Sequence, residues 1–211
     1  MLGHVESPTD IPTSIPLDDW LAKLGQSTGA PGGGAASGVM LGIAASLLSM
    51  VAAYTPDDPR AAECGRRVAG LRGEALRGAE SDGIVSADFG SALALPEDDQ
   101  DRDARVRDAA VRAAESAARL GASGMALLSE LRVLREIGNR SLSADLAVAA
   151  AALSAGLSGS SINLRANLRT ARAHHATAAD LAELRVVAAQ LAETQQSAAQ
   201  IAGDLSAEFE G

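Results

Sequence analysis

The stretch PGGGAASGVMLGIAASLLSMVAAYTP, residues 31–56, decides the fold. It lies within a longer run, from Leu24 to Pro56, that contains no charged residue. Residues 35–54 are predicted to form one helix, and a helix that is apolar on every side is buried in a protein core or inserted in a membrane. Three serines lower its hydrophobicity, basic flanks are missing and no second apolar span is expected. The sequence therefore favours a buried central helix and leaves a single-span membrane protein as the alternative.

Within this helix, Gly34, Gly38 and Gly42 recur every fourth residue and therefore lie on one stripe. Each glycine costs about 1 kcal/mol relative to alanine in a helix interior. Three on one stripe predict a place where another group comes close to the backbone. The neighbour is another helix of the bundle, a two-fold mate in a dimer, or a ligand.

The rest of the chain also favours helices, because alanine is abundant and alternating apolar runs are rare. We predict a single all-α domain, a multi-helix bundle around the Gly/Ala-rich helix, over residues 17–211, preceded by a loose N-terminal arm over 1–16. The flanking helices are predicted at 17–24, 59–82, 83–95, 102–137 with a break at 121–124, 143–174 and 178–208.

The chain carries a formal net charge of −9. This disfavours nucleic acid and anionic membranes as partners, because both attract basic surfaces. The single cysteine, Cys64, and the absence of a signal-like apolar core near the N-terminus predict a cytoplasmic protein. No metal site is expected, because the adjacent His174 and His175 diverge on a helix and no Cys/His cluster lies elsewhere.

Three features are candidates for a functional site, each with a structural alternative. The Pro31–Gly34 turn at a helix start points free backbone amides at a ligand, or is only a tight turn. Asp82 lies between two predicted helical runs and is a cap or a general base. Asn163 and Asn167 share a helix face, and their amides bind a neighbouring helix or a polar ligand.

Together these features resemble the cyclodeaminase/cyclohydrolase family of folate enzymes, which includes the C-terminal part of formimidoyltransferase-cyclodeaminase and stand-alone methenyltetrahydrofolate cyclohydrolases. The order and spacing of its short motifs agree over about two thirds of the chain. The matching elements are Pro31–Gly34 followed by Met50-Val51, Asp82 followed by Leu95-Pro96, Gly138-Asn139 with Asp145, and Asn163 with Asn167-Leu168.

The resemblance implies an all-helical homodimer that acts on a tetrahydrofolate one-carbon unit, with no cofactor beyond that substrate. Hydrolysis of 5,10-methenyltetrahydrofolate to 10-formyltetrahydrofolate is the expected reaction, because the sequence shows no transferase domain to supply a formimidoyl substrate. Asp82 is the implied catalytic residue. The implied substrate-binding residues are Gly32, Gly33, Gly34, Asn139, Asp145, Asn163 and Asn167.

The sequence departs from the family pattern at four positions. Ala35 and Ala144 replace serines, Ser86 replaces an aromatic residue, and Ser141 replaces an asparagine. Two alternatives therefore stand beside hydrolysis. One is a formimidoyltetrahydrofolate cyclodeaminase that releases ammonia, and the other is a non-catalytic helical binding or assembly module that retains the fold.

Overall fold

The computed structural model describes residues 15–27 and 30–210, and within these ranges it contains helices and no strand, as expected for an all-α protein. Most of the predicted arm, residues 1–14, lies outside the described residues. The helices are α1 (Leu17–Leu24), α2 (Gly33–Ala53), α3 (Pro59–Leu93), α4 (Arg102–Ile137), a short 3₁₀ turn η1 (Arg140–Leu142), α5 (Ser143–Ala173) and α6 (Ala182–Ala207).

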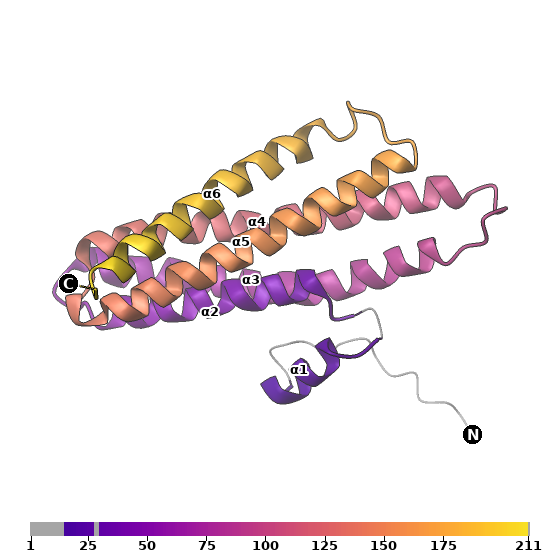
Figure 1. Cartoon of the computed structure of the whole chain (residues 1–211). Coiled ribbons are helices and arrows are strands. Elements are labelled where there is room, and N and C mark those ends of the chain that lie inside the picture. The colour runs from indigo at the N-terminus through magenta and orange to yellow at the C-terminus, as the bar shows by residue number, and fades with distance from the viewer. Residues whose placement is uncertain (1–14, 28–29, 211) are drawn as a thin grey trace, which may run out of the picture.

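Helices α3 to α6 form an elongated bundle, and α2 lies along part of its length (Figure 1). Helix α2 packs against α3 and α5, while α4 packs against the same two helices and α6 packs chiefly against α5. Because α2 is 21 residues long and α3 is 35, the N-terminus of α2 lies part-way along the bundle. The short α1 attaches beside that terminus, where Trp20 packs against Ala35 and Ala79.

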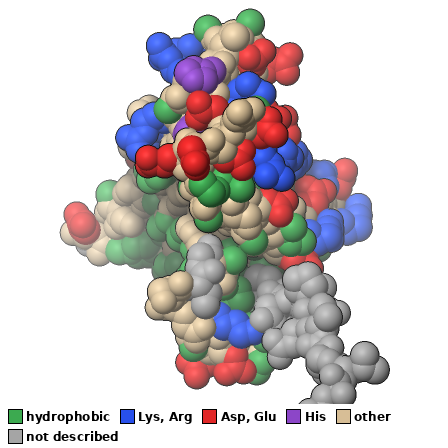
Figure 2. All heavy atoms as spheres, turned by 90° about the vertical axis from the view of Figure 1, so that its right-hand side faces the viewer, with side chains coloured by type: hydrophobic (Ala, Val, Ile, Leu, Met, Phe, Trp, Pro, Cys, Tyr) green, Lys and Arg blue, Asp and Glu red, His purple; other side chains and the backbone are tan. Residues whose placement is uncertain are grey.

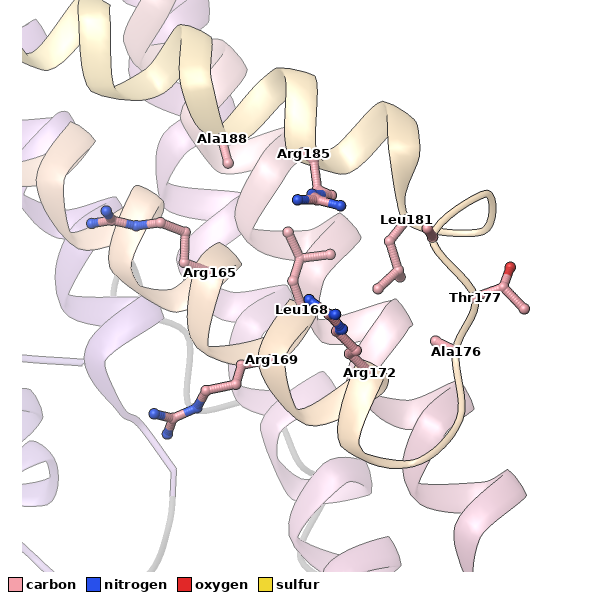
Figure 3. Close-up of a pocket in the computed structure, with 10 residues that line it drawn as sticks. Arg165, Leu168, Arg169, Arg172, Ala176, Thr177, Leu181, Arg185 and Ala188 are labelled. Carbon is pink, nitrogen blue, oxygen red and sulfur yellow. The ribbon is translucent and has the colours of Figure 1, made fainter.

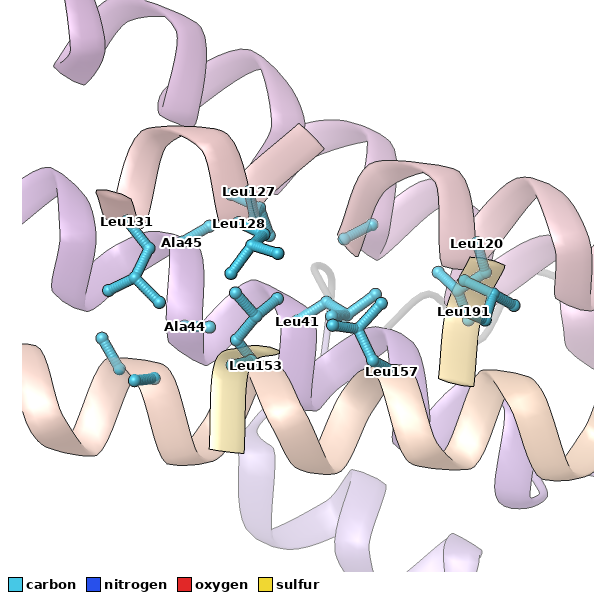
Figure 4. Close-up of a cluster of buried hydrophobic side chains, with 14 of the residues drawn as sticks. Leu41, Ala44, Ala45, Leu120, Leu127, Leu128, Leu131, Leu153, Leu157 and Leu191 are labelled. Carbon is cyan, nitrogen blue, oxygen red and sulfur yellow. The ribbon is translucent and has the colours of Figure 1, made fainter. Parts of the chain in front are cut away.

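Leucines and alanines make up most of the core between α2, α4 and α5 (Figure 4). Leu41 and Leu48 of α2, Leu127 of α4 and Leu153 of α5 have no exposed surface. Full burial of such a side chain contributes about 1.5–3 kcal/mol, so these contacts hold α2 in place. Their burial agrees with the prediction of a central helix.

The glycine stripe of α2 faces α3 of the same chain, which decides among the three neighbours predicted for it. A Cβ atom added at Gly38 would lie 2.7 Å from the Cβ of Ala79 and 2.8 Å from the carbonyl oxygen of Ala75. At Gly42 it would lie 3.0 Å from a methyl group of Leu76. The stripe therefore allows close packing of two helices within the bundle.

Three predicted boundaries are wrong. Helix α3 continues through 82–83 without a break, and α4 continues through 121–124. The glycines of α4 are packing positions, because a Cβ at Gly121 would collide with Leu191 and one at Gly124 with Leu157. Helix α6 begins at Ala182 instead of 178, after a turn in which Asp180 accepts a hydrogen bond from the backbone N–H of Thr177.

By length and composition alone, two helical stretches of the described residues could cross a membrane, α2 and Arg140–Ala173. The expectation that no second apolar span follows α2 is therefore wrong. The bundle buries 56% of the apolar window of α2 and 39% of that of the second stretch. Both helices thus keep apolar surface outside the core of a single chain.

The end of the bundle that carries the α3–α4 and α5–α6 connections is rich in charged side chains. Figure 2 shows acidic and basic side chains intermingled over much of this end, together with histidine. His174 lies there, with its Nδ1 atom 2.7 Å from a carboxylate oxygen of Asp103. The mixed charges are typical of a solvated surface.

Candidate active site

The carboxylate of Asp82 projects from the middle of α3 onto the first turn of α2. It accepts a hydrogen bond from the backbone N–H of Ala35. The N-cap residue of α2, Gly32, has no side chain to perform this function. Asp82 therefore caps α2, and the prediction that it caps its own helix is wrong because α3 is continuous there.

Gly34 is required by this arrangement, since a Cβ atom at that position would overlap the Asp82 carboxylate. With glycine at position 34, the backbone of α2 lies closer to the carboxylate than a residue with a Cβ atom would allow. The positive end of the α2 dipole faces the carboxylate at the same place. The predicted residues Gly32, Gly33, Gly34 and Asp82 accordingly form one cluster.

Burial raises the pKa of Asp82, and the hydrogen bonds from the Ala35 N–H and the Ser86 hydroxyl only partly oppose this rise. The Ser86 hydroxyl lies 3.4 Å from Oδ2 of Asp82. Within residues 15–27 and 30–210, no lysine, arginine or histidine forms an ion pair with Asp82. A carboxyl group without a cationic neighbour can exchange a proton and favours a cationic ligand.

Asn163 approaches this cluster from α5. Its amide oxygen and nitrogen lie 3.6 and 3.7 Å from the position of a Cβ added at Gly33. Neither Asn163 nor Asn167, one turn further along, has a hydrogen bond to any residue that the structure describes, and both are half-buried. Two half-buried amides without a helix partner favour the ligand alternative.

Asn139 and Asp145 lie at the opposite end of α2. The Asn139 side chain donates to the carbonyl oxygen of Tyr54 and accepts from the N–H of Ser141, so it joins the end of α2 to η1. Asp145 lies in the first turn of α5, 18 residues from Asn163. That spacing corresponds to about 27 Å along a helix. A single chain therefore divides the predicted site residues between the two ends of α2.

Two departures from the family pattern fall beside Asp82. The Ala35 side chain is buried against Trp20, while its N–H makes the hydrogen bond to the carboxylate that a serine backbone would also make. The contact of Ser86 with Asp82 is absent from the sequence predictions. The spacing of Asp82 and Ser86 could have predicted this contact, because residues four apart on a helix are neighbours.

A separate cavity of about 520 Å³ lies in the groove between α5 and α6 (Figure 3). Arg165, Arg169, Arg172 and Arg185 line it, and none forms an ion pair with a described residue. Figure 3 shows Leu168 between Arg172 of α5 and Arg185 of α6. Arg165 is two residues from Asn163 and so faces away from it on α5. The cavity is therefore distinct from the Asp82 cluster.

Among the residues that the structure describes, no three or more histidine, cysteine, aspartate or glutamate side chains come together in a group that could hold a metal ion. In the cluster of Gly32, Gly33, Gly34, Asp82 and Asn163, Asp82 is the residue that can gain or lose a proton. His174 and His175, which the sequence analysis set aside as a metal pair, lie with Asp103 at the charged end of the bundle.

Comparison with known proteins gives a match to a solved structure and a match to a family model. A formiminotetrahydrofolate cyclodeaminase from Thermotoga maritima, a solved structure, superimposes with a TM-score of 0.74 at 22% sequence identity, covering 92% of this chain and 98% of that one. No curated protein sequence matches. The sequence model of the formiminotransferase-cyclodeaminase family matches residues 16–200. A match over most of the chain, from α1 into α6, shows that this protein belongs to the formiminotransferase-cyclodeaminase family.

Proposed function

We propose that the protein hydrolyses 5,10-methenyltetrahydrofolate to 10-formyltetrahydrofolate, with Asp82 as the catalytic acid–base group. Family membership supports a folate one-carbon substrate. The observation that carries the proposal is the Asp82 carboxylate, held against the first turn of α2 with a raised pKa and without a cationic partner among the described residues. The one-carbon bridge of the substrate is a cation, which supplies the missing opposite charge.

The proposed reaction has two steps. Asp82 removes a proton from a water molecule whose oxygen attacks the methenyl carbon between N5 and N10. Asp82 then gives the proton to N5 as the bond from that carbon to N5 breaks, and the new hydroxyl group on the carbon loses its proton to solvent as it becomes the carbonyl of the 10-formyl product. A carboxyl group with a raised pKa suits both steps, because its two protonation states lie closer in energy near neutral pH.

The surrounding groups position the substrate in this proposal. The free N–H groups of Gly33 and Gly34 and the amides of Asn163 and Asn167 offer donors and acceptors to the pterin ring. Tetrahydrofolate is then the only small molecule that the chemistry needs. Asn139 keeps a role in the fold, since its side chain is engaged with Tyr54 and Ser141.

Cyclodeamination of formimidoyltetrahydrofolate is the second candidate, and the reaction named for the Thermotoga maritima structure favours it. In that reaction N10 attacks the formimidoyl carbon and the terminal nitrogen leaves as ammonia. Asp82 would supply the proton that the leaving nitrogen needs. The two reactions use the same carbon and the same carboxyl group, so they differ only in the group that attacks and the group that leaves.

The test compares purified wild-type protein with Asp82→Asn on both substrates. Hydrolysis is followed as loss of methenyl absorbance above the uncatalysed rate, and deamination as release of ammonia. Asn retains the acceptor for the Ala35 N–H but cannot take a proton, so the variant should keep its helical fold and lose about 10²–10⁴-fold in kcat. Full activity of this variant would refute the role of Asp82.

A matched control is Asp88→Asn, the same substitution on α3 at an exposed position. It should leave turnover unchanged. Ammonia release without methenyl hydrolysis would replace the first candidate by the second. A wild-type protein that binds tetrahydrofolate but turns over neither substrate would support the non-catalytic module instead.

A further inference from the structure

The groove between α5 and α6 carries a basic patch that the proposed reaction does not use. Three arginines of α5, Arg165, Arg169 and Arg172, follow one another at intervals of four and three residues, so they share one stripe of the helix. Arg185 of α6 also lines the cavity of about 520 Å³ in this groove. All four residues are exposed, and none forms an ion pair with a residue that the structure describes.

Acidic residues are missing from this region of an otherwise acidic chain. Between Asp145 and Asp180 the sequence contains no aspartate or glutamate, although the whole chain has 27 of them against 18 lysines and arginines. The Asp180 carboxylate itself accepts a hydrogen bond from the backbone N–H of Thr177, at 2.8 Å. None of the described residues that line the cavity is acidic. The positive charge of the cavity is therefore left for a group from outside the chain.

The positions of these charges oppose the stability of the helices. Like charges three or four residues apart on a helix repel each other, as Arg165 and Arg169 do. Arg185 lies in the first turn of α6, which begins at Ala182, and the positive end of the helix dipole disfavours a cation there. Arg172 is the exception, because the last turn of α5 favours a cation. Local helix preferences therefore do not explain the patch as a whole, whereas an anionic ligand does.

Two of the arginines flank an apolar surface within the cavity. In Figure 3 the guanidinium groups of Arg172 and Arg185 lie on either side of Leu168, whereas those of the other two arginines extend away from it. Leu168 and Leu181 are buried, and with Ala188 they form the apolar part of the lining. A ligand in the cavity would therefore meet one cation from each helix and a hydrocarbon surface between them.

The chemistry of the cavity matches a phosphate group joined to an apolar body. A guanidinium group presents a planar fork of N–H donors that fits two oxygens of a phosphate. A phosphate monoester carries nearly two negative charges at neutral pH and three acceptor oxygens, so two arginines can share it. The cavity volume falls within the range of about 300–1,000 Å³ that is usual for small-molecule sites. Its apolar lining then accommodates the rest of the molecule.

We propose that the cavity between α5 and α6 binds a small, soluble phosphate monoester with an apolar body. Arg172 and Arg185 hold the phosphate from the two sides of the groove, and the apolar body lies on Leu168 and Leu181. Acidic side chains intermingle with basic ones at this end of the bundle, which disfavours an anionic membrane surface and favours a dissolved ligand. The cavity lies apart from the Asp82 cluster, so no step of the folate reaction depends on it.

The first experiment varies the ligand on the wild-type protein. Isothermal titration calorimetry measures the binding of 1-naphthyl phosphate, methyl phosphate and uncharged 1-naphthol. Naphthyl phosphate should bind about 10-fold or more tightly than methyl phosphate, because its rings bury apolar surface on the two leucines. It should also bind more tightly than 1-naphthol, which lacks the charged group. Absence of saturable binding of naphthyl phosphate below about 1 mM, or equal binding of 1-naphthol, would overturn the proposal.

The second experiment varies the arginines. Arg172→Gln and Arg185→Gln should each weaken the binding of naphthyl phosphate by about 10–100-fold, because each loses charge-assisted hydrogen bonds. Arg165→Gln should weaken it by less than about 5-fold, because the Nε atom of Arg165 donates to the carbonyl oxygen of Ser161 and its guanidinium group extends away. Arg66→Gln, at an exposed position on α3, is the distant control and should have no effect. Equal losses in the three cavity variants would show a general effect of charge and refute the roles of Arg172 and Arg185.

Melting temperatures separate a binding role of Arg185 from a structural one. Without ligand, Arg185→Gln should melt no lower than the wild type, because the substitution removes a cation from the positive end of α6. Naphthyl phosphate should raise the melting temperature of the wild type and leave that of the variant unchanged. A variant that melts lower but binds naphthyl phosphate normally would make Arg185 a structural residue and end the proposal.

A competition experiment tests whether the cavity instead receives the acidic tail of a folate. Tri-γ-glutamate and methyl phosphate are each titrated against the complex of the wild type with naphthyl phosphate. Methyl phosphate should displace the ligand at lower concentrations than the peptide does, because a phosphate monoester concentrates its charge on one group between Arg172 and Arg185. Displacement by the peptide at lower concentrations would assign the cavity to the folate substrate and overturn the separate site.

Discussion

Gly38→Ala is the sharpest test of how α2 is held in the bundle. The added methyl group would lie 2.7 Å from the Cβ of Ala79 and 2.8 Å from the carbonyl oxygen of Ala75. Neither neighbour can rotate away, since one is a methyl group fixed to the backbone and the other is the backbone itself. The two helices must therefore separate by a few tenths of an ångström or more.

The magnitude follows from two opposing effects. Alanine in place of glycine favours the helix by about 1 kcal/mol, whereas forcing an extra methyl group into a packed contact costs about 1–3 kcal/mol. Gly38→Ala should therefore change the free energy of unfolding by about 0 to −2 kcal/mol. Gly70→Ala on α3 is the matched control, because a Cβ there has no neighbour within 4 Å. Gly70→Ala should raise the free energy of unfolding by about 1 kcal/mol, the full difference in helix preference between alanine and glycine.

The difference between these variants isolates the packing cost, about 1–3 kcal/mol. Urea unfolding followed by circular dichroism at one fixed protein concentration measures it, because dimer formation would make stability depend on concentration. In a chain of this size 1 kcal/mol corresponds to about 2–4 °C in the melting temperature. If Gly38→Ala stabilises as much as Gly70→Ala, the close contact between α2 and α3 is wrong.

Three further predictions concern titratable groups. Because burial raises the pKa of Asp82, the protein should lose stability as pH rises through that pKa. Asp82→Asn should remove this loss, and the free energy of unfolding at acidic and at neutral pH measures it. Glu130 behaves oppositely. Burial raises its pKa, but the hydrogen bonds from Arg67, at 2.7 and 2.9 Å, the contact with Cys64 and the charge of Arg67 together outweigh burial and lower the pKa. The stability that ionised Glu130 adds is present above the pKa of Glu130 in the unfolded chain and is lost as pH falls through its lowered pKa in the folded protein. Glu130→Gln should therefore lower the free energy of unfolding by about 1–3 kcal/mol at neutral pH and by less in acid. An equal loss at both pH values would contradict the ion pair. Burial raises the pKa of Cys64 to about 12, so a thiol reagent should modify it only after unfolding, and rapid labelling of native protein would show that the site opens.

Sequence patterns predicted the fold well where local chemistry determines it. The uncharged run indicated α2, the proline at 59 marked the start of α3, and Gly25 marked the end of α1. They failed at Gly83, Gly121 and Gly124, where a glycine-containing stretch was interpreted as a helix end or break. In a bundle this tight, contacts with Leu191 and Leu157 offset the low helix preference of glycine in α4.

The candidate site was predicted as a set of residues but not as a geometry. Asp82, the glycine turn and Asn163 come together because α3 and α5 both pack on α2, which spacing along the chain does not reveal. The separation of Asn139 and Asp145 from Asp82 follows from the length of α2, once the helix is known to be continuous over 21 residues. Ser86 was treated as a lost aromatic contact, whereas its hydroxyl touches the carboxylate.

The cap that Asp82 provides to α2 links two selective pressures on one side chain. Gly32 leaves the start of α2 without a cap of its own, and the carboxylate that replaces it is also the one proposed to move protons. A mutation selected for stability at this place would alter the acid–base group, and a mutation selected for a new reaction would loosen the helix. Divergence of function within this fold should therefore proceed by changing the neighbours of the carboxylate, as position 86 illustrates, while the carboxylate itself stays in place.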